Sequence, residues 1–230
     1  MKKKKINRRH FIRNSSLAVL GAGALSQSAF SMGSSFSDEM NPPRIMNYKT
    51  LGKTGFKVSD IASGAPKNET TLRALLRSGV NFIDTGETYG NGNNERLIGR
   101  VIKDFDRKKL FINSKLYTED TFESKEEVVR RTRKALERLQ TDYVDCMMIH
   151  SADNSKILKD EAFHAGMKQM KAEGRVRHVG VSCHGSAWYR LPEESLETVL
   201  LNAVEDGRFD VFLMTYNFIN ANMAEKVFEA

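Results

Sequence analysis

From Tyr48 onward the chain alternates between short apolar runs and amphipathic helical patterns, and this alternation constrains the fold more than any other feature. The apolar runs occupy residues 60–65, 80–85, 110–115, 143–150, 178–183 and 210–217. Nearly continuous apolar runs are typical of strands that are buried on both faces of a parallel sheet. Strands that are separated by helices in this way predict an α/β protein.

The segments between the runs carry helix signals, and residues 124–140 carry the clearest ones. Ser124, followed three residues later by Glu127, forms a capping box that marks a helix start. The predicted apolar face of this helix has helical spacing: Val128, Val129, Thr132, Ala135, Leu136 and Leu139. Three other predicted helices end at glycines, which are favoured just past a helix C-terminus: Gly79, Gly174 and Gly207.

Polar residues close five of the apolar runs: Asp84, Lys115, His150, Ser182 and Tyr216. They follow one another at spacings of 31, 35, 32 and 34 residues, and each spacing is the length of one strand–helix unit. A parallel sheet brings all these strand ends to one side, which is the active-site side in a (β/α)8 TIM barrel. An open doubly wound sheet is disfavoured, because no Gly-x-Gly-x-x-Gly turn follows the first run. We therefore predict a TIM barrel.

The formal net charge of +7 belongs to the first 31 residues. Residues 1–31 contain seven lysines and arginines and no acidic residue, so the rest of the chain has no net charge. A neutral body gives no electrostatic support for binding nucleic acid. The two cysteines, Cys146 and Cys183, lie in apolar runs and are predicted to be small buried hydrophobes rather than a disulfide or metal ligands.

Residues 1–31 have the pattern of a targeting segment. A basic start precedes a short apolar stretch, residues 17–29, which is too short and too rich in Gly, Ala and Ser for a stable membrane span of about 20 apolar residues. Arg8-Arg9, followed by Phe11-Ile12-Arg13, resembles the twin-arginine export signal, and a general secretory signal is the alternative. We expect export to the periplasm by the twin-arginine translocase, with cleavage after Ser28 or Ser31. The Pro-containing residues 32–47 are predicted to be a linker, and residues 48–230 the barrel.

The ends of the second and third runs combine three groups that suit proton transfer. A free tyrosine has a pKa near 10 and is a poor proton donor at neutral pH. A neighbouring lysine ammonium is expected to lower that pKa, and a carboxylate can hold the lysine in place. Tyr89, Lys115 and Asp84 supply these groups, while His150 can donate a hydrogen bond to a substrate oxygen.

Each of these residues alone has an ordinary structural interpretation. Asp84 could cap the following loop, and a single histidine such as His150 is more often a core residue than a catalyst. Lys115 is the exception, because an unpaired lysine is expensive to bury. The set of four at one face favours catalysis.

Several dispersed segments together resemble the aldo-keto reductases: "LGKTGFKVS", "GVNFIDTGETYGNGNNERLIG", "NSK", "RLQTDYVDCMMIH" and "EGRVRHVGVS". The resemblance implies a barrel that binds a nicotinamide cofactor, usually NADPH, without a Rossmann fold, and that reduces an aldehyde or ketone to an alcohol. By position, Tyr89 matches the general acid, Lys115 and Asp84 its pKa-tuning partners, and His150 the residue that orients the substrate.

The resemblance also implies cofactor contacts at four residues, with departures from the family pattern: Gly64, Asp84, Ser182 and Cys183. The family usually has Ser-Asn where this chain has Ser182-Cys183, a threonine at Ala65 and a glutamine at Leu213. These changes replace strong hydrogen-bonding groups with weak or apolar ones. NADP(H) is the expected cofactor and NAD(H) stays open. His184, Trp188 and Tyr189 are candidates for the substrate mouth or for surface packing.

Two rival functions come from other classes. A non-catalytic NADP(H)-binding regulatory member would retain the four residues by ancestry, and Cys183 and Leu213 favour it. A barrel hydrolase could use Asp84 and Glu87, because glycosidases need two carboxyl groups about 5–9.5 Å apart. A metal-dependent hydrolase would need clustered His and Asp ligands. Both hydrolases are disfavoured, and no metal is expected.

Only six of the eight strand–helix units of a TIM barrel are predicted in residues 48–230. We therefore expect a C-terminally truncated piece of a longer reading frame, with roughly 60–100 further residues carrying two more units. Alone, it is expected neither to bind NADP(H) tightly nor to unfold cooperatively.

Overall fold

The computed structural model describes residues 44–185 and 194–230. Contacts divide the chain into Met1–Asn41 and Pro42–Ala230, and the described residues all belong to the second unit. The predictions for the targeting segment, and for the linker as far as residue 43, fall outside the described residues. The structure therefore bears on the predicted barrel and on the last four residues of the predicted linker.

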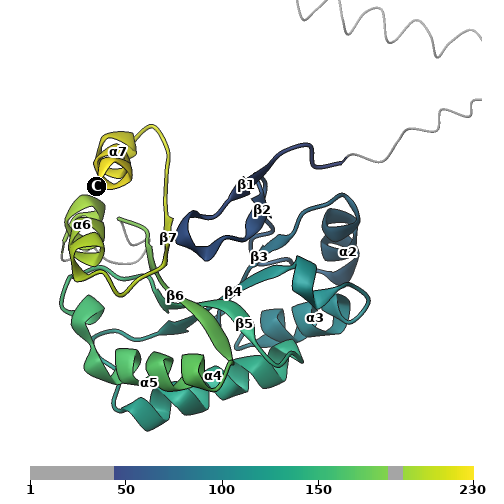
Figure 1. Ribbon diagram of the computed structural model, residues 1–230, viewed down its shortest axis with the longest axis horizontal. Coiled ribbons are helices and arrows are strands. Elements are labelled where there is room, and N and C mark those ends of the chain that lie inside the picture. Colours follow the sequence, from purple (N-terminus) through teal and green to yellow (C-terminus); the bar gives the residue numbers. More distant parts are fainter. Residues whose placement is uncertain (1–43, 186–193) are drawn as a thin grey trace, which may run out of the picture. The chain divides into compact units, whose positions relative to one another are not determined.

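A five-stranded parallel sheet forms the centre of this unit, and its spatial order is the chain order. The strands are β3 (Phe82–Asp84), β4 (Phe111–Tyr117), β5 (Val144–His150), β6 (Val176–Cys183) and β7 (Val211–Met214). The sheet curls, and the helices lie along its convex side (Figure 1). A curled parallel sheet in chain order is the arrangement of part of a TIM barrel, so the predicted fold class is confirmed.

In the described part of the chain, six α-helices accompany the strands: α2 (Glu69–Arg77), α3 (Asn93–Ile102), α4 (Lys125–Leu139), α5 (Glu161–Ala172), α6 (Leu196–Asp206) and α7 (Ala221–Glu229). Single 3-10 turns lie at Gly52–Thr54, Arg107–Lys109 and Ile157–Lys159. Within the part of the chain that the structure describes, none of the helices is long and apolar enough to cross a bilayer.

Helix α4 matches the prediction closely. Ser124 caps it by accepting a hydrogen bond from the Glu127 N–H, and every residue of the predicted apolar face is buried. The Glu127 carboxylate accepts from the Glu123 N–H rather than from the Ser124 N–H, so the reciprocal half of the capping box is shifted by one residue. The glycines also act as predicted, since Gly174 and Gly207 follow helix ends in the left-handed region.

The first predicted strand, residues 60–65, does not form. Only Ser63 bridges to β3, in parallel with Ile83, and the Ser63 carbonyl accepts from the Asp84 N–H at 2.8 Å. Short side chains in this run bury little surface against a neighbouring strand, so their strand propensity is weak. The segment still runs beside β3 and parallel to it, as the predicted parallel sheet requires.

A hairpin that was not among the predicted elements precedes the sheet: β1 (Tyr48–Thr50) pairs antiparallel with β2 (Lys57–Ser59). Asn81, just before β3, fastens it by accepting from the Ser59 N–H and donating to the Lys57 carbonyl. Phe56, just before β2, lies edge-on against Phe111 at the inner face, with ring centroids 5.5 Å apart. The hairpin therefore covers the inner face where the strands begin.

The two faces of the sheet bury different sets of side chains. The outer face joins the helices in the larger core, and the inner face holds a smaller cluster: Phe82, Phe111, Cys146, Met148 and Val211. Both cysteines are buried and free, as predicted. Toward the strand C-termini the inner face becomes polar, and that change positions the site.

The N-terminal ends of the strands are fastened by a buried acid. Asp145 lies 2.7 Å from Arg107 and 3.0 Å from Arg177, and it also accepts from the Ile112 N–H. The two guanidinium groups lie over the ring of Tyr143, at 4.0 and 3.8 Å from its centroid. This arrangement joins the turn before β4 to strands β4, β5 and β6.

Candidate active site

Lys115 is the centre of the site, because β4 turns it toward the inner face and leaves it only 1% exposed. Its Nζ lies 2.6 Å from Asp84 Oδ1 and donates to the Thr85 carbonyl at 2.7 Å. Burial lowers the pKa of Lys115, and the pair with Asp84 opposes that shift. A buried ammonium paired with a carboxylate is what the sequence predicted for these two residues.

Asn113 is a site residue that the prediction missed. It lies opposite Asp84 in the β3–β4 register, and its Nδ2 donates to Asp84 Oδ1 at 2.6 Å. Its Oδ1 is buried and has no hydrogen-bond partner among the described residues. The available signal was its position two residues before Lys115, because alternate residues of a strand share a face.

Tyr89 reaches the site from the loop after β3. Asn91 and the flanking glycines Gly90 and Gly92 adopt positive φ, which explains why this loop is rich in glycine and asparagine. The ring of Tyr89 faces Lys115, with Nζ 5.1 Å from the ring centroid. Its hydroxyl lies 3.5 Å from His150 Nε2. The loop thus places the phenol between the lysine and the histidine.

The pKa of Tyr89 is raised, first by burial and then by the charge of Asp84. The sequence predicted the opposite direction, with Lys115 lowering it, and that prediction is wrong for this structure. The ammonium lies over the ring and is paired with Asp84, so its effect on the hydroxyl is offset. The phenol is therefore protonated at neutral pH.

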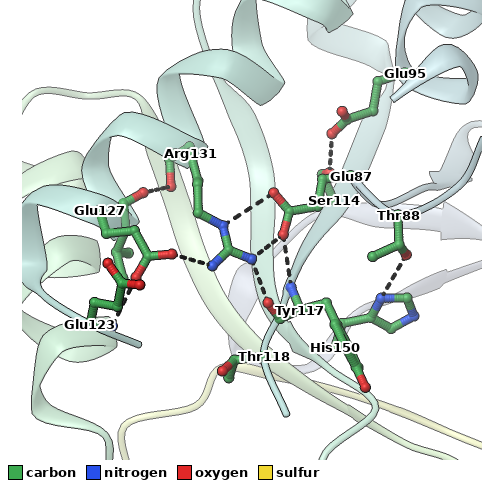
Figure 2. Close-up of polar contacts among 12 residues, drawn as sticks. Glu87, Thr88, Glu95, Ser114, Tyr117, Thr118, Glu123, Glu127, Arg131 and His150 are labelled. Carbon is green, nitrogen blue, oxygen red and sulfur yellow. Dashed lines mark hydrogen bonds and ion pairs between the residues drawn. The ribbon is translucent and has the colours of Figure 1, made fainter. Parts of the chain in front are cut away.

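His150 is a buried neutral imidazole. Its pKa is lowered to about 3, mainly by burial and to a lesser degree by the charges of Lys115 and His184. Its Nδ1 lies 3.3 Å from Thr88 Oγ1, and the ring of Tyr117 packs edge-on against it at 6.0 Å (Figure 2). A neutral imidazole donates one N–H, which suits a hydrogen bond to a substrate oxygen.

A cavity of about 230 Å³ opens beside these groups. It is lined by Asp84, Tyr89, Lys115, Ser182, Cys183, His184, Leu213, Met214 and Thr215. The strand ends of β3, β4, β6 and β7 therefore meet around one space, as a parallel sheet requires. His184 also lies 3.4 Å from Thr215 across this rim.

Of the predicted cofactor contacts, Asp84, Ser182 and Cys183 line the cavity, and Gly64 does not. The Ser182 hydroxyl accepts from the Ser151 N–H at 2.8 Å and lies 3.3 Å from the Ile149 carbonyl. Cys183 is buried, and burial raises its pKa to about 11. Gly64 is exposed beside the end of β3, with open space where a side chain would be. Cofactor binding by these residues stays a prediction.

Tyr216, which the sequence placed at a strand end, does not line the cavity. Tyr216 is 57% exposed, because β7 ends at Met214, and its ring packs on Phe228 of α7. Trp188 and Tyr189 lie outside the described residues.

Glu87, the second carboxylate of the hydrolase alternative, is bound to Arg131 and accepts from the Tyr117 N–H (Figure 2). It does not face Asp84 as a free acid. Among residues 44–185 and 194–230 there is also no group of three or more His, Cys, Asp or Glu side chains that could hold a metal. The described geometry therefore gives no support to a hydrolase.

A family model described as the aldo/keto reductase family matches residues 50–226. The chain belongs to the aldo/keto reductase family. Its curated relatives include L-galactose dehydrogenase from Arabidopsis thaliana, 31% identical over 183 residues that cover 72% of this chain and 54% of that protein. A protein of the same plant named "Probable voltage-gated potassium channel subunit beta" is 32% identical over 132 residues, which cover 50% of this chain and 40% of that protein.

Solved structures of aldo/keto reductases agree with this assignment. One from Klebsiella pneumoniae, in complex with NADP and acetate, has a TM-score of 0.52 at 28% identity, and the match covers 67% of this chain and 53% of that one. The chain spans about half the length of the curated relatives that it matches.

Proposed function

We propose that this aldo/keto reductase reduces an aldehyde or ketone to an alcohol with NADPH, in a reversible reaction. The observation that carries the proposal is the convergence of four groups, three of which line the cavity: Asp84, Tyr89 and Lys115. The buried Lys115–Asp84 pair lies under the ring of Tyr89, and a neutral His150 lies beside the phenol.

The residues at the cavity fit the nicotinamide end of such a cofactor. The cavity combines apolar walls from Leu213 and Met214 with the polar groups of Asp84 and Lys115. At about 230 Å³ it is smaller than a typical pocket for a drug-sized ligand, so it suits a ring and not a whole dinucleotide. When bound, NADPH supplies the hydride.

The chain's own residues donate and accept the proton. Tyr89 holds its proton at neutral pH and gives it to the carbonyl oxygen in reduction, and its phenolate takes the proton back in oxidation. Lys115 stabilises the phenolate that forms, because its ammonium lies over the ring. His150 donates a hydrogen bond that orients the carbonyl, and Asp84 keeps the ammonium in place.

Replacing Tyr89 with Phe tests the proposal, because the ring stays and only the proton donor is removed. Reduction of a panel of aldehydes, followed by loss of NADPH absorbance, should fall by about 10²–10⁴-fold. NADPH affinity, from a fluorescence titration, should stay unchanged. Tyr117→Phe is the matched control, since this second phenol also packs against His150 but does not line the cavity. Activity of the Tyr89 variant within a few-fold of the parent would remove Tyr89 from the mechanism.

A second function, non-catalytic binding of NADP(H) in a regulatory role, is favoured by a specific observation. The hydroxyl of Ser182 is engaged with backbone groups, and Leu213 offers no hydrogen bond to the cavity. The relative named as a channel subunit is also consistent with it. Binding of NADPH without turnover of any carbonyl would select this function over reduction.

We propose further that residues 1–31 direct export to the periplasm through the twin-arginine translocase. The support is Arg8-Arg9 followed by Phe11-Ile12-Arg13, together with the weakly apolar stretch after it. This route carries folded proteins, which suits a domain that acquires a cytoplasmic cofactor before it leaves.

A further inference from the structure

Arg131, in the middle of α4, binds groups from three different segments (Figure 2). Its guanidinium pairs with Glu87 of the loop after β3, donates to the Tyr117 carbonyl at the end of β4, and lies 2.7 Å from Glu127 in the first turn of α4. Glu87 in turn accepts from the Tyr117 N–H at 2.9 Å. We call Glu87, Tyr117, Glu127 and Arg131 the Arg131 clamp.

The clamp is largely removed from solvent. The side chains of Arg131, Glu87 and Glu127 are 19%, 16% and 15% exposed. Burial opposes the charge of Arg131, but the hydrogen bonds that it donates to Glu87 and Glu127 outweigh this effect, so the pKa of Arg131 is raised. A planar guanidinium with several partners fixes their relative orientation in a way that a point charge does not.

The loop after β3 and the end of β4, which the clamp joins to α4, both carry groups of the site. Glu87 precedes Tyr89 by two residues, and its N–H donates to the Lys115 carbonyl at 3.2 Å. Tyr117 follows Lys115 by two residues, and its ring packs on His150. The guanidinium and the two carboxylates of the clamp bind none of the reacting groups, so any effect that they have on the reaction must act through the positions of those groups.

We propose that the Arg131 clamp is a positioning device that holds the phenol of Tyr89 over Lys115 and beside His150. This inference rests on the proposed function, and it extends the site to α4, on the convex side of the sheet. Displacing a reacting group by about 1 Å can cost about 100-fold in rate. Loss of the clamp therefore affects turnover more than it affects substrate or cofactor binding.

The chain offers a matched control on the same helix. Arg133, two residues further along α4, also pairs with a glutamate, Glu173, but its side chain is 55% exposed and no site residue lies among its partners. Arg131→Gln and Arg133→Gln thus remove the same charge from the same helix. Only the first should affect the site.

Two readouts test the proposal in the full chain. With a carbonyl substrate, Arg131→Gln should lower kcat about 10–100-fold while KM changes by less than about threefold, and Arg131→Lys should recover only part of that loss. Without any substrate, NMR of labelled tyrosine should show the titration midpoint of Tyr89 moving back toward 10 in Arg131→Gln, because the phenol leaves its buried position. Arg133→Gln should behave as the parent in both readouts.

The outcomes separate the two proposals. If the parent reduces no carbonyl but the Tyr89 midpoint still moves in Arg131→Gln, positioning is supported and the proposed function fails. If Arg131→Gln matches Arg133→Gln in both kcat and midpoint, the inference is wrong. Should Arg131→Gln not fold, judged by circular dichroism, Glu87→Gln replaces it, and unfolding of both variants would show a stability element instead of a positioning device.

Discussion

The neutral state of His150 is the feature most open to direct measurement. Its pKa of about 3 in the folded chain compares with 6.5 for an ordinary histidine. That gap of about 3.5 units disfavours the charged imidazole by about 5 kcal/mol, at 1.36 kcal/mol for each unit. The folded state binds the proton more weakly than the unfolded state, so His150 contributes its full stability above pH 6.5. That contribution is lost as pH falls from 6.5 toward 3.

The experiment is NMR of histidine labelled with 13C in the imidazole ring, recorded from pH 8 to pH 4.5. His150→Gln assigns the resonance, and the urea-unfolded chain supplies the reference midpoint near 6.5. The His150 resonance of the folded chain should not move above pH 5. Lys115→Met removes one of the two charges that lower the pKa, so the midpoint should rise while staying below the unfolded value, because burial is the larger cause.

A midpoint at or above pH 6 in the folded parent would show that His150 is solvated, and the argument for a neutral hydrogen-bond donor would be refuted. If the midpoint is low, any acid limb in a pH–rate profile between pH 5 and 8 must come from another group. The measurement needs no substrate, so its result does not depend on whether the proposed reaction is correct.

Two other perturbations test separate parts of the chain. Gly99→Ala should lower the free energy of unfolding by about 1–3 kcal/mol, because the new Cβ would lie 2.6 Å from the Arg138 carbonyl oxygen on rigid backbone. Urea unfolding should show this loss, while Gly64→Ala, which has open space around it, should not. Replacing Arg8-Arg9 with Lys-Lys should keep the protein in the cytoplasm, because the export receptor reads the arginine pair. Export of the Lys-Lys variant, seen by cell fractionation, would point to the general secretory route.

Periodicity was enough to predict the parts of the fold that depend on burial alone. Helix α4 and its apolar face follow from spacing, and the parallel sheet follows from continuous apolar runs. The meeting of Asp84, Lys115 and His150 follows from the sheet, because parallel strands end on one side. Residues 60–65 were wrongly predicted to be a strand. A short apolar run does not show how much surface its small side chains can bury against a neighbouring strand.

Other features depend on where atoms lie in space. The direction of the Tyr89 pKa shift was wrong because sequence order does not show that the ammonium lies over the ring, or how far the phenol is buried. The Arg131 clamp was missed for a related reason. Glu87 and Arg131 are 44 residues apart, and a charged residue beside an apolar helix face is usually solvated. Asn113 alone could have been predicted, from its shared face with Lys115.

The buried Asp145 has a consequence for how this protein can change over time. Its two arginines and the tyrosine between them fasten the sheet at the end opposite the cavity, and no group of the site takes part in that fastening. Substitutions in the loops around the cavity should therefore leave these contacts of the sheet intact. A substitution at Asp145, in contrast, should weaken the contacts among all the strands that it joins. New substrate preferences should arise by replacing loops at one end, and the other end should tolerate little. For an engineer, the Asp145 end is the part to leave untouched while the cavity is rebuilt.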